Sequence, residues 1–157
     1  MKQPLLVLML MMSVLCTGAT SCDKSEDIRT ENNNGEENMT TNKITVKVGQ
    51  KTFTATLLDN SSAKAFKKLL PMTINMVELN GNEKYYDLSG SLPTNSSNVG
   101  TIQNGELMLY GSKTLVLFYK SFSTSYSYSR LGRLDDVSGL AEALGSGSIS
   151  VKFELAN

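Results

Sequence analysis

Short alternating segments dominate the sequence from residue 43 onward and set its fold class. Residues 44–48 read Ile-Thr-Val-Lys-Val and residues 52–57 read Thr-Phe-Thr-Ala-Thr-Leu, with Gly49-Gln50 between them. Successive side chains of a β-strand point to opposite faces, so an apolar residue at every second position gives one buried face. This segment therefore predicts a β-hairpin with a two-residue turn.

Further segments have the composition of strands and are separated by turns rich in Gly, Asn and Ser. Residues 107–110 and 115–119 are apolar at both odd and even positions, which is expected of central strands that are covered on both sides. A chain rich in strands and poor in helices favours a small, mostly β barrel. The strands expected after the first hairpin are residues 73–79, 84–88, 106–110, 114–119 and 148–154.

Two short helices are expected to plug or flank the ends of the barrel. Asn60 or Ser61 can cap the first helix, which Pro71 stops after Leu70. The second helix ends at Gly145. Basic side chains of the first helix lie outside its apolar stripe and are expected in solvent. These are Lys64, Lys67 and Lys68, and the second helix is expected over residues 136–144.

The side chains available after the first 22 residues exclude most catalytic chemistry. The chain has 157 residues, with 15 Lys and Arg against 15 Asp and Glu, no His, and two Cys that both lie in its first 22 residues. Imidazole bases, thiolate nucleophiles and Cys/His metal sites are therefore excluded from the folded part. Asp87, Asp135 and Asp136 lack the spacing of a calcium loop, and there is no basic run for a phosphate backbone. We expect no cofactor, no metal and no nucleic-acid partner.

The first 21 residues have the pattern of an export signal. Lys2 precedes an apolar core from Leu5 to Leu15, and small residues follow at 17–21. A helix of that core would be roughly 16 Å long, about half of the ~30 Å hydrocarbon layer of a membrane. We therefore expect residues 1–21 to be a signal peptide that is removed.

Ala19-Thr20-Ser21-Cys22 resembles the lipobox of bacterial lipoproteins, in which cleavage exposes a Cys that carries a diacylglycerol. The resemblance implies lipidation of Cys22 and a lipid anchor in the cell envelope, in the outer membrane on its periplasmic or its outer side. Cys16 is the poorer candidate because it follows the bulky Leu15. An ordinary secretory signal with an incidental Cys is the alternative.

The segment after Cys22 has the composition of a flexible tether. Residues 22–42 contain six acidic and two basic residues, which gives a net charge of −4, and almost no large apolar side chains. Such a segment cannot bury enough apolar surface to offset the entropy cost of ordering its backbone. We expect a disordered acidic tether that spans about 25 Å and leads to a folded domain over residues 43–157.

The expected domain contains an apolar strand at 105–110, its return strand at 115–119, and the stretch Ser-Arg-Leu-Gly-Arg-Leu-Asp at 129–135. In these segments it resembles the cyclophilin-like domain proteins of bacteria. The likeness extends to residues 70–71, 80–85 and 91–94. The resemblance implies a closed β-barrel of about eight strands. The stretch Phe-x-Met-Gln-Gly-Gly-Asp, which is typical of cyclophilins that isomerise X-Pro bonds, does not occur in this sequence.

One segment stands out as a candidate binding site. Residues 121–130 alternate Ser with larger side chains, so an extended chain would present hydroxyls on one face and aromatic rings with a terminal guanidinium on the other. Aromatic rings and an Arg fork suit a peptide or a small organic ligand. Tyr85 and Tyr86 point to opposite faces of a strand, so at most one of them can join this surface. The candidate residues are Phe122, Tyr126, Tyr128, Arg130, Tyr119 and Tyr85.

These observations favour a lipid-anchored, non-catalytic module that binds a peptide, a protein or a small molecule. The alternative is a prolyl isomerase with a non-standard site, in which Arg130 or Arg133 would hydrogen-bond the proline nitrogen as the amide twists. An ion pair of Arg133 with Asp135 or Asp136 is the simpler interpretation of that cluster. If the aromatic residues only cover the barrel, the domain would be a structural component of the envelope.

Overall fold

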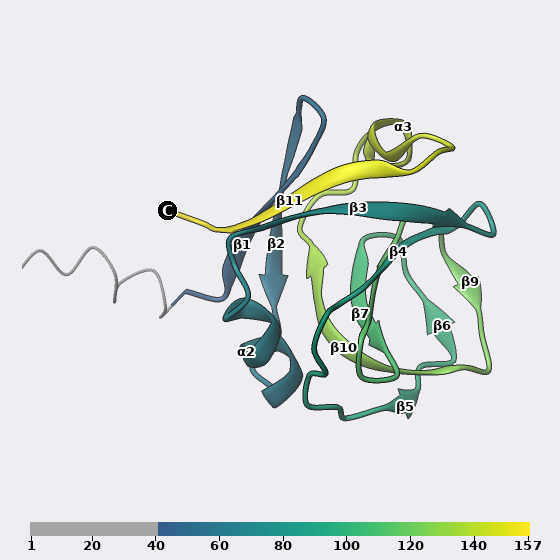
Figure 1. The fold of residues 1–157 in the computed structure, drawn as a ribbon. Helices are drawn as coiled ribbons and strands as arrows, with labels where there is room; N and C mark the ends of the chain where they lie inside the picture. The colour runs from purple at the N-terminus through teal and green to yellow at the C-terminus, as the bar shows by residue number, and fades with distance from the viewer. Residues whose placement is uncertain (1–40) are drawn as a thin grey trace, which may run out of the picture. The chain divides into compact units, whose positions relative to one another are not determined.

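Antiparallel strands make up 49% of the chain that the computed structural model describes, which is residues 41–157 (Figure 1). The predicted signal peptide, Cys22 and nearly all of the predicted tether lie outside these residues. The strands are β1 (Lys43–Val48), β2 (Lys51–Leu57), β3 (Met72–Leu79), β4 (Glu83–Asp87), β5 (Ser97–Asn98), β6 (Thr101–Ile102), β7 (Glu106–Tyr110), β8 (Thr114–Phe118), β9 (Phe122–Ser123), β10 (Ser127–Leu134) and β11 (Ile149–Leu155), and the helices are α2 (Ser61–Lys67) and α3 (Leu140–Leu144).

The main sheet closes on itself, which confirms the predicted mostly β barrel. Its strands follow the order β2-β1-β11-β3-β4-β8-β7-β10, and β10 pairs again with β2 to complete a closed antiparallel barrel of 8 strands. At this last seam Gly132 lies opposite Leu57, where a Cβ atom would come within 2.4 Å of the Thr56 carbonyl oxygen. Closure at that point therefore requires glycine.

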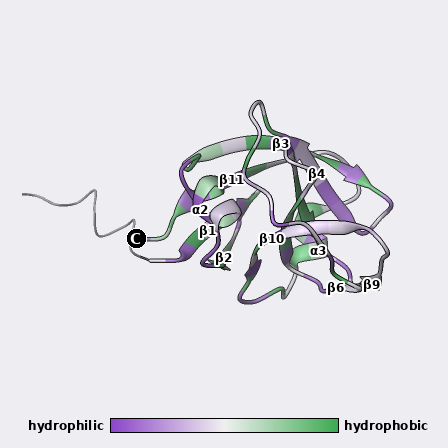
Figure 2. Cartoon of the chain, turned by 90° about the horizontal axis from the view of Figure 1, so that it is seen from below, coloured by the Kyte–Doolittle hydropathy of each residue, from purple (hydrophilic) through white to green (hydrophobic). Residues whose placement is uncertain are grey.

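Alternation along the strands separates the inside of the barrel from its outer face. On β8, Leu115 and Leu117 belong to the main core, whereas Val116 and Phe118 belong to a second apolar cluster. The colours of Figure 2 show the same alternation of hydrophobic and hydrophilic residues along β1 and β2. The main core is large and includes Ile44, Val46, Phe53, Phe66, Leu107, Leu109, Leu131, Val151 and Phe153.

The second apolar cluster lies on the outer face of β4, β8, β7 and β10. Met108, Val116, Phe118 and Tyr128 point outward from these strands and are covered by Ile102 of β6, with Val99 and Phe122 packed beside them. This cover explains why β7 and β8 are apolar on both faces, as the sequence indicated. It also means that a short two-stranded sheet, β6 with β9, lies against the barrel wall.

Both helices are shorter than the sequence predicted. The first begins as expected, with the Asn60 side chain accepting a hydrogen bond from the Ala63 N–H at 2.8 Å, but it ends at Lys67 and not at Leu70. The prediction that Lys67 points into solvent was wrong, because Lys67 is buried and donates a hydrogen bond to the Thr41 carbonyl. No helix in residues 41–157 has both the length and the apolar character needed to cross a membrane.

The second helix begins at Leu140 and not at Asp136. The Asp136 carboxylate accepts a hydrogen bond from the Ser138 N–H at 2.8 Å, which stabilises a turn in place of the first helical turn. Gly139 then adopts a left-handed conformation with φ of 73°, so the helical register can only start after it.

Candidate functional site

A cavity of about 590 Å³ opens on the outer face of the barrel, between the strand that carries Glu83 and the segment that follows β8. This volume lies in the range of small-molecule pockets. The residues that line the cavity are Leu79, Asn80, Asn82, Glu83, Tyr85, Asp87, Tyr110, Thr114, Val116, Phe122, Ser123, Thr124, Ser125, Tyr126 and Tyr128.

Strand alternation determines which side chains form the floor of this cavity. Tyr85 and Val116 are paired neighbours on β4 and β8, and both point outward. Tyr110 and Tyr128 are paired neighbours on β7 and β10 and point to the same side. Each of these residues sits next to a residue that faces the core, so the floor follows directly from the register of four neighbouring strands.

The wall of the cavity is the segment from Phe122 to Tyr126. It is held from the side opposite the cavity, because β9 pairs with β6 and the Thr124 N–H donates to the Gly100 carbonyl at 2.8 Å. The Asn98 amide also donates to the Ser125 carbonyl at 3.2 Å. The backbone of the wall is therefore fixed, while its side chains remain available to line the cavity.

A chain of aromatic contacts connects the wall to the floor. The Phe118 ring packs against Phe122 and Tyr128, with ring centroids 5.7 and 5.5 Å apart. Tyr110 in turn contacts both Tyr128 and Tyr126, at 5.5 and 6.1 Å. Contacts of this kind hold the rings in preferred tilted and edge-to-face arrangements. The cavity therefore has a rigid aromatic side and a ring, Tyr126, that is 62% exposed at its mouth.

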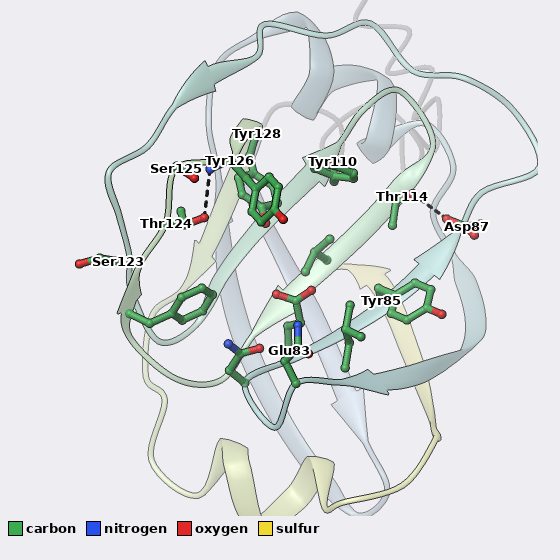
Figure 3. Close-up of a pocket in the computed structure, with 15 residues that line it drawn as sticks. Glu83, Tyr85, Asp87, Tyr110, Thr114, Ser123, Thr124, Ser125, Tyr126 and Tyr128 are labelled. Carbon is green, nitrogen blue, oxygen red and sulfur yellow. Dashed lines mark hydrogen bonds between the residues drawn. The ribbon is translucent and has the colours of Figure 1, made fainter.

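Glu83 places a carboxylate in the middle of the cavity (Figure 3). The residue is only 8% exposed, and within residues 41–157 its side chain has no hydrogen bond and no ion pair. Burial, together with repulsion from the Glu78 carboxylate, raises the pKa of Glu83 above its usual value. Burial and the same Glu83 charge, with smaller effects of Tyr110 and Tyr126, raise the pKa of Tyr128 to about 12.

Asp87 is the other acidic residue of the cavity, and it lies at the exposed rim. Its carboxylate accepts a hydrogen bond from the Thr114 hydroxyl at 2.6 Å (Figure 3). In residues 41–157 no three acidic side chains come close enough together to hold a metal ion. The cavity therefore offers aromatic surface, hydroxyl groups and two carboxylates of very different burial.

Four of the predicted site residues come together in this cavity, namely Tyr85, Phe122, Tyr126 and Tyr128. As expected, Tyr85 and Tyr86 point to opposite sides, since Tyr86 packs against the main core. Whether the four residues contact a ligand stays a prediction.

The other predicted residues lie elsewhere. Arg130 follows Tyr128 on the same face of β10 but lies beyond the cavity, with its Nε 3.5 Å from a Glu106 carboxylate oxygen. Arg133 is also not among the residues that line the cavity. Its neighbour Asp135 pairs with Lys43 at 2.8 Å and accepts a hydrogen bond from the Thr56 hydroxyl. The prediction of an isomerase that uses Arg130 or Arg133 remains untested.

Tyr119 belongs to a second polar group, at the barrel interior, and not to the cavity. Its hydroxyl donates to the Glu78 carboxylate at 2.8 Å, and the ammonium group of Lys84 donates to the same carboxylate. Lys84 is completely buried and also donates to the carbonyls of Gly145 and Gly147, at 2.8 and 2.7 Å. This polar group therefore ties β3 and β4 to the loop between α3 and β11.

The pKa values of the Glu78 carboxyl and the Tyr119 phenol shift in opposite directions. Burial alone would raise the pKa of Glu78, but hydrogen bonds from Lys84, Tyr119 and the Gly81 N–H outweigh it, and the pKa of Glu78 is lowered. Burial and the hydrogen bond to Glu78 raise the pKa of Tyr119 to about 12. At neutral pH the cluster is therefore a neutral phenol, a carboxylate and the Lys84 side chain.

Sequence reasoning did not find Glu83, Lys84 or Tyr110. A signal for two of them was present, because Glu83 and Tyr85 are two positions apart on one strand and Tyr110 extends the outward series of β7. The cover over the outer face makes Glu83 a cavity residue, and that cover depends on contacts between distant parts of the chain.

Comparison with known proteins agrees with the barrel. No curated protein matches the chain. The solution structure of the hypothetical protein AF2241 from Archaeoglobus fulgidus is similar, with a TM-score of 0.55 and 16% sequence identity over 74% of this chain and 95% of that one. At this identity the likeness shows a shared fold. The sequence over residues 46–154 matches the Cyclophilin-like family, and the chain therefore belongs to that family.

Proposed function

We propose that this domain is a non-catalytic binding module that takes a peptide or a small organic ligand into the outer cavity. The observation that supports the proposal most is the aromatic lining of a cavity of about 590 Å³, in which Tyr85, Phe122, Tyr126 and Tyr128 converge. Aromatic rings give broad apolar contact, and the tyrosine hydroxyls and nearby Ser and Thr side chains add polar contacts that orient a ligand.

A catalytic role has less support from the same residues. An activated nucleophile needs a base within hydrogen-bond reach, and in residues 41–157 no hydroxyl of the cavity donates to Glu83. The Thr114 hydroxyl is the one with an acidic partner, and that partner is the exposed Asp87 at the rim. The cavity is therefore better suited to holding a ligand than to attacking it.

A titration with aromatic fragments, followed by the amide signals in two-dimensional NMR, tests this proposal. We expect p-cresol and N-acetyl-tyrosine amide to shift the amides of residues 82–87, 110–116 and 122–128. Replacing Tyr126 with Ala should weaken binding about threefold to tenfold, since it removes one exposed stacking ring. The control Leu58→Ala changes an exposed apolar residue outside the cavity and should leave affinity unchanged. Shifts confined to other surfaces, or equal loss in both variants, would contradict the proposal.

We further propose that Cys22 carries a lipid that anchors the domain in the cell envelope, with residues 22–42 as the tether. The proposal depends on the resemblance of residues 19–22 to a lipobox. In cells that produce the full chain with an alkyne-labelled fatty acid, the protein should be labelled and should sediment with membranes. Replacing Cys22 with Ala should abolish both, and Cys16→Ala should change neither. Labelling that persists in Cys22→Ala would show that the anchor is wrong.

A further inference from the structure

Glu83 is a buried residue whose carboxylate faces the cavity and has no partner of opposite charge within residues 41–157. It is 8% exposed, and the side chain has no hydrogen bond or ion pair within residues 41–157. A buried charge is costly unless it is paired, because desolvation is not repaid by a favourable contact. The neighbouring Lys84 cannot serve as the partner, since it points to the other face of β4 and binds Glu78 and the carbonyls of Gly145 and Gly147.

The rest of the cavity lining carries no positive charge and combines aromatic rings with neutral polar and apolar side chains. Its lining includes Asp87 besides Glu83 and contains no Lys and no Arg, so an anionic ligand would meet only like charge. In Figure 3 the Glu83 carboxylate lies between the rings of Tyr126 and Tyr128 on one side and Tyr85 on another. The face of an aromatic ring attracts a cation, and the attraction increases when water is excluded.

From these observations we infer that the cavity recognises a protonated amine carried on an apolar body, with Glu83 as the partner of the ammonium group. This inference rests on the proposed binding function and assigns its ligand class. The ammonium group would pair with the Glu83 carboxylate beside the tyrosine rings. The apolar body would fill the remaining space against Val116 and Phe122.

Three probes of nearly equal size and different charge test the inference. Benzylammonium, benzyl alcohol and benzoate are titrated into the full protein, and binding is followed by the amide signals of residues 82–87 and 122–128. We expect benzylammonium to bind at least about tenfold tighter than benzyl alcohol, because hydrogen bonds to charged groups are the stronger ones. Benzoate should bind most weakly of the three.

Two variants identify the residue responsible for the preference. Glu83→Gln keeps the shape of the side chain and should abolish the preference for benzylammonium over benzyl alcohol. Asp87→Asn removes the exposed carboxylate at the rim and should reduce benzylammonium affinity less than about threefold, since exposed charges are screened. An equal loss in both variants would overturn the assignment to Glu83.

The outcomes separate this inference from the proposed function. Equal binding of benzylammonium and benzyl alcohol in the cavity would leave the binding module in place and overturn the amine as its ligand. Absence of shifts in the cavity with all three probes would overturn the binding function and the inference with it. The tripeptides Ac-Ala-Lys-Ala-NH2 and Ac-Ala-norleucine-Ala-NH2 then distinguish whether the ammonium group belongs to a lysine side chain of a peptide or to a free amine. A lysine peptide that binds tighter than benzylammonium indicates a peptide ligand, and a weaker one indicates a free amine.

Discussion

Replacing Lys84 with Met is expected to lower the free energy of unfolding by about 3–5 kcal/mol, which is the usual cost of removing one partner from a buried ion pair. Lys84 is 0% exposed, and its ammonium group donates to Glu78 and to the carbonyls of Gly145 and Gly147. Met has a similar length and no donor. The variant would therefore leave a charged carboxylate and two carbonyl oxygens without their main partner. Chemical denaturation of the purified protein measures the loss.

The control for this experiment is a lysine in an exposed ion pair. Lys64 lies 2.6 Å from Asp59, and both side chains are largely exposed, so Lys64→Met should change the free energy of unfolding by less than about 1 kcal/mol. The double variant Glu78→Gln/Lys84→Met should recover part of the loss, because it removes the carboxylate that Lys84→Met leaves unpaired. A Lys84→Met protein that is as stable as the wild type would show that the cluster is not a stabilising contact.

The second large effect has the opposite sign, because Glu83→Gln is expected to stabilise the protein at neutral pH. Burial and repulsion from Glu78 raise the pKa of Glu83 in the folded state. The Glu83 carboxyl therefore loses its proton at a higher pH in the folded state than in the unfolded state. The contribution of Glu83 to stability is therefore greatest below the unfolded-state pKa of about 4.3 and is lost as the pH rises through the folded-state value. Glutamine carries no charge and avoids this loss.

Other titrating groups near Glu83 do not obscure this comparison. Glu78, whose pKa is lowered, and Asp87 are present in both proteins, so their direct contributions cancel in the difference. The pKa of Tyr128 is about 12, and this ring stays neutral from pH 4 to pH 8. We expect Glu83→Gln to be more stable than the wild type by about 1 kcal/mol at pH 7, since an unsatisfied buried group costs at least that much. The gain would mean that the wild type keeps a destabilising charge, as binding sites often do.

The barrel could be predicted from the sequence because alternation is a local signal. The register of β1 with β2, and the apolar character of both faces of β7 and β8, follow from residue order alone. The boundaries of the helices were harder to predict from the sequence. The second helix starts four residues after its predicted first residue, because a turn closed by Asp136 and the left-handed Gly139 precede it. Both features are properties of the backbone geometry.

Only part of the cavity could be predicted from the sequence, because the segments that cover the outer face of the barrel determine where the cavity ends. The alternation of residues 121–130 indicated the rings at Phe122, Tyr126 and Tyr128, but it could not show where along β10 the cavity ends, and Arg130 lies past that point. Tyr119 lies two positions after Leu117 and, like Leu115 and Leu117, belongs to the main core and not to the outer face.

Glu83 and Lys84 show a different limit of sequence reasoning. Charged residues are mostly exposed in folded proteins, so the sequence carries no local signal that Glu83 and Lys84 are both buried. The Lys84 side chain enters the barrel, where Glu78 compensates its charge. The Glu83 side chain faces the cavity, where no group of residues 41–157 compensates its charge. That contrast depends on contacts between residues that are far apart in the sequence.

A single comparison decides whether the cavity holds an unpaired carboxylate, on which the ligand assignment depends. The free energy of unfolding is measured for the wild type and for Glu83→Gln between pH 3.5 and pH 8, without ligand. We predict nearly equal stability at pH 3.5 and a growing advantage of Glu83→Gln as the pH rises to 7. A Glu83→Gln protein that is less stable than the wild type at pH 7 would show that Glu83 already has a stabilising partner, and would contradict the site described here.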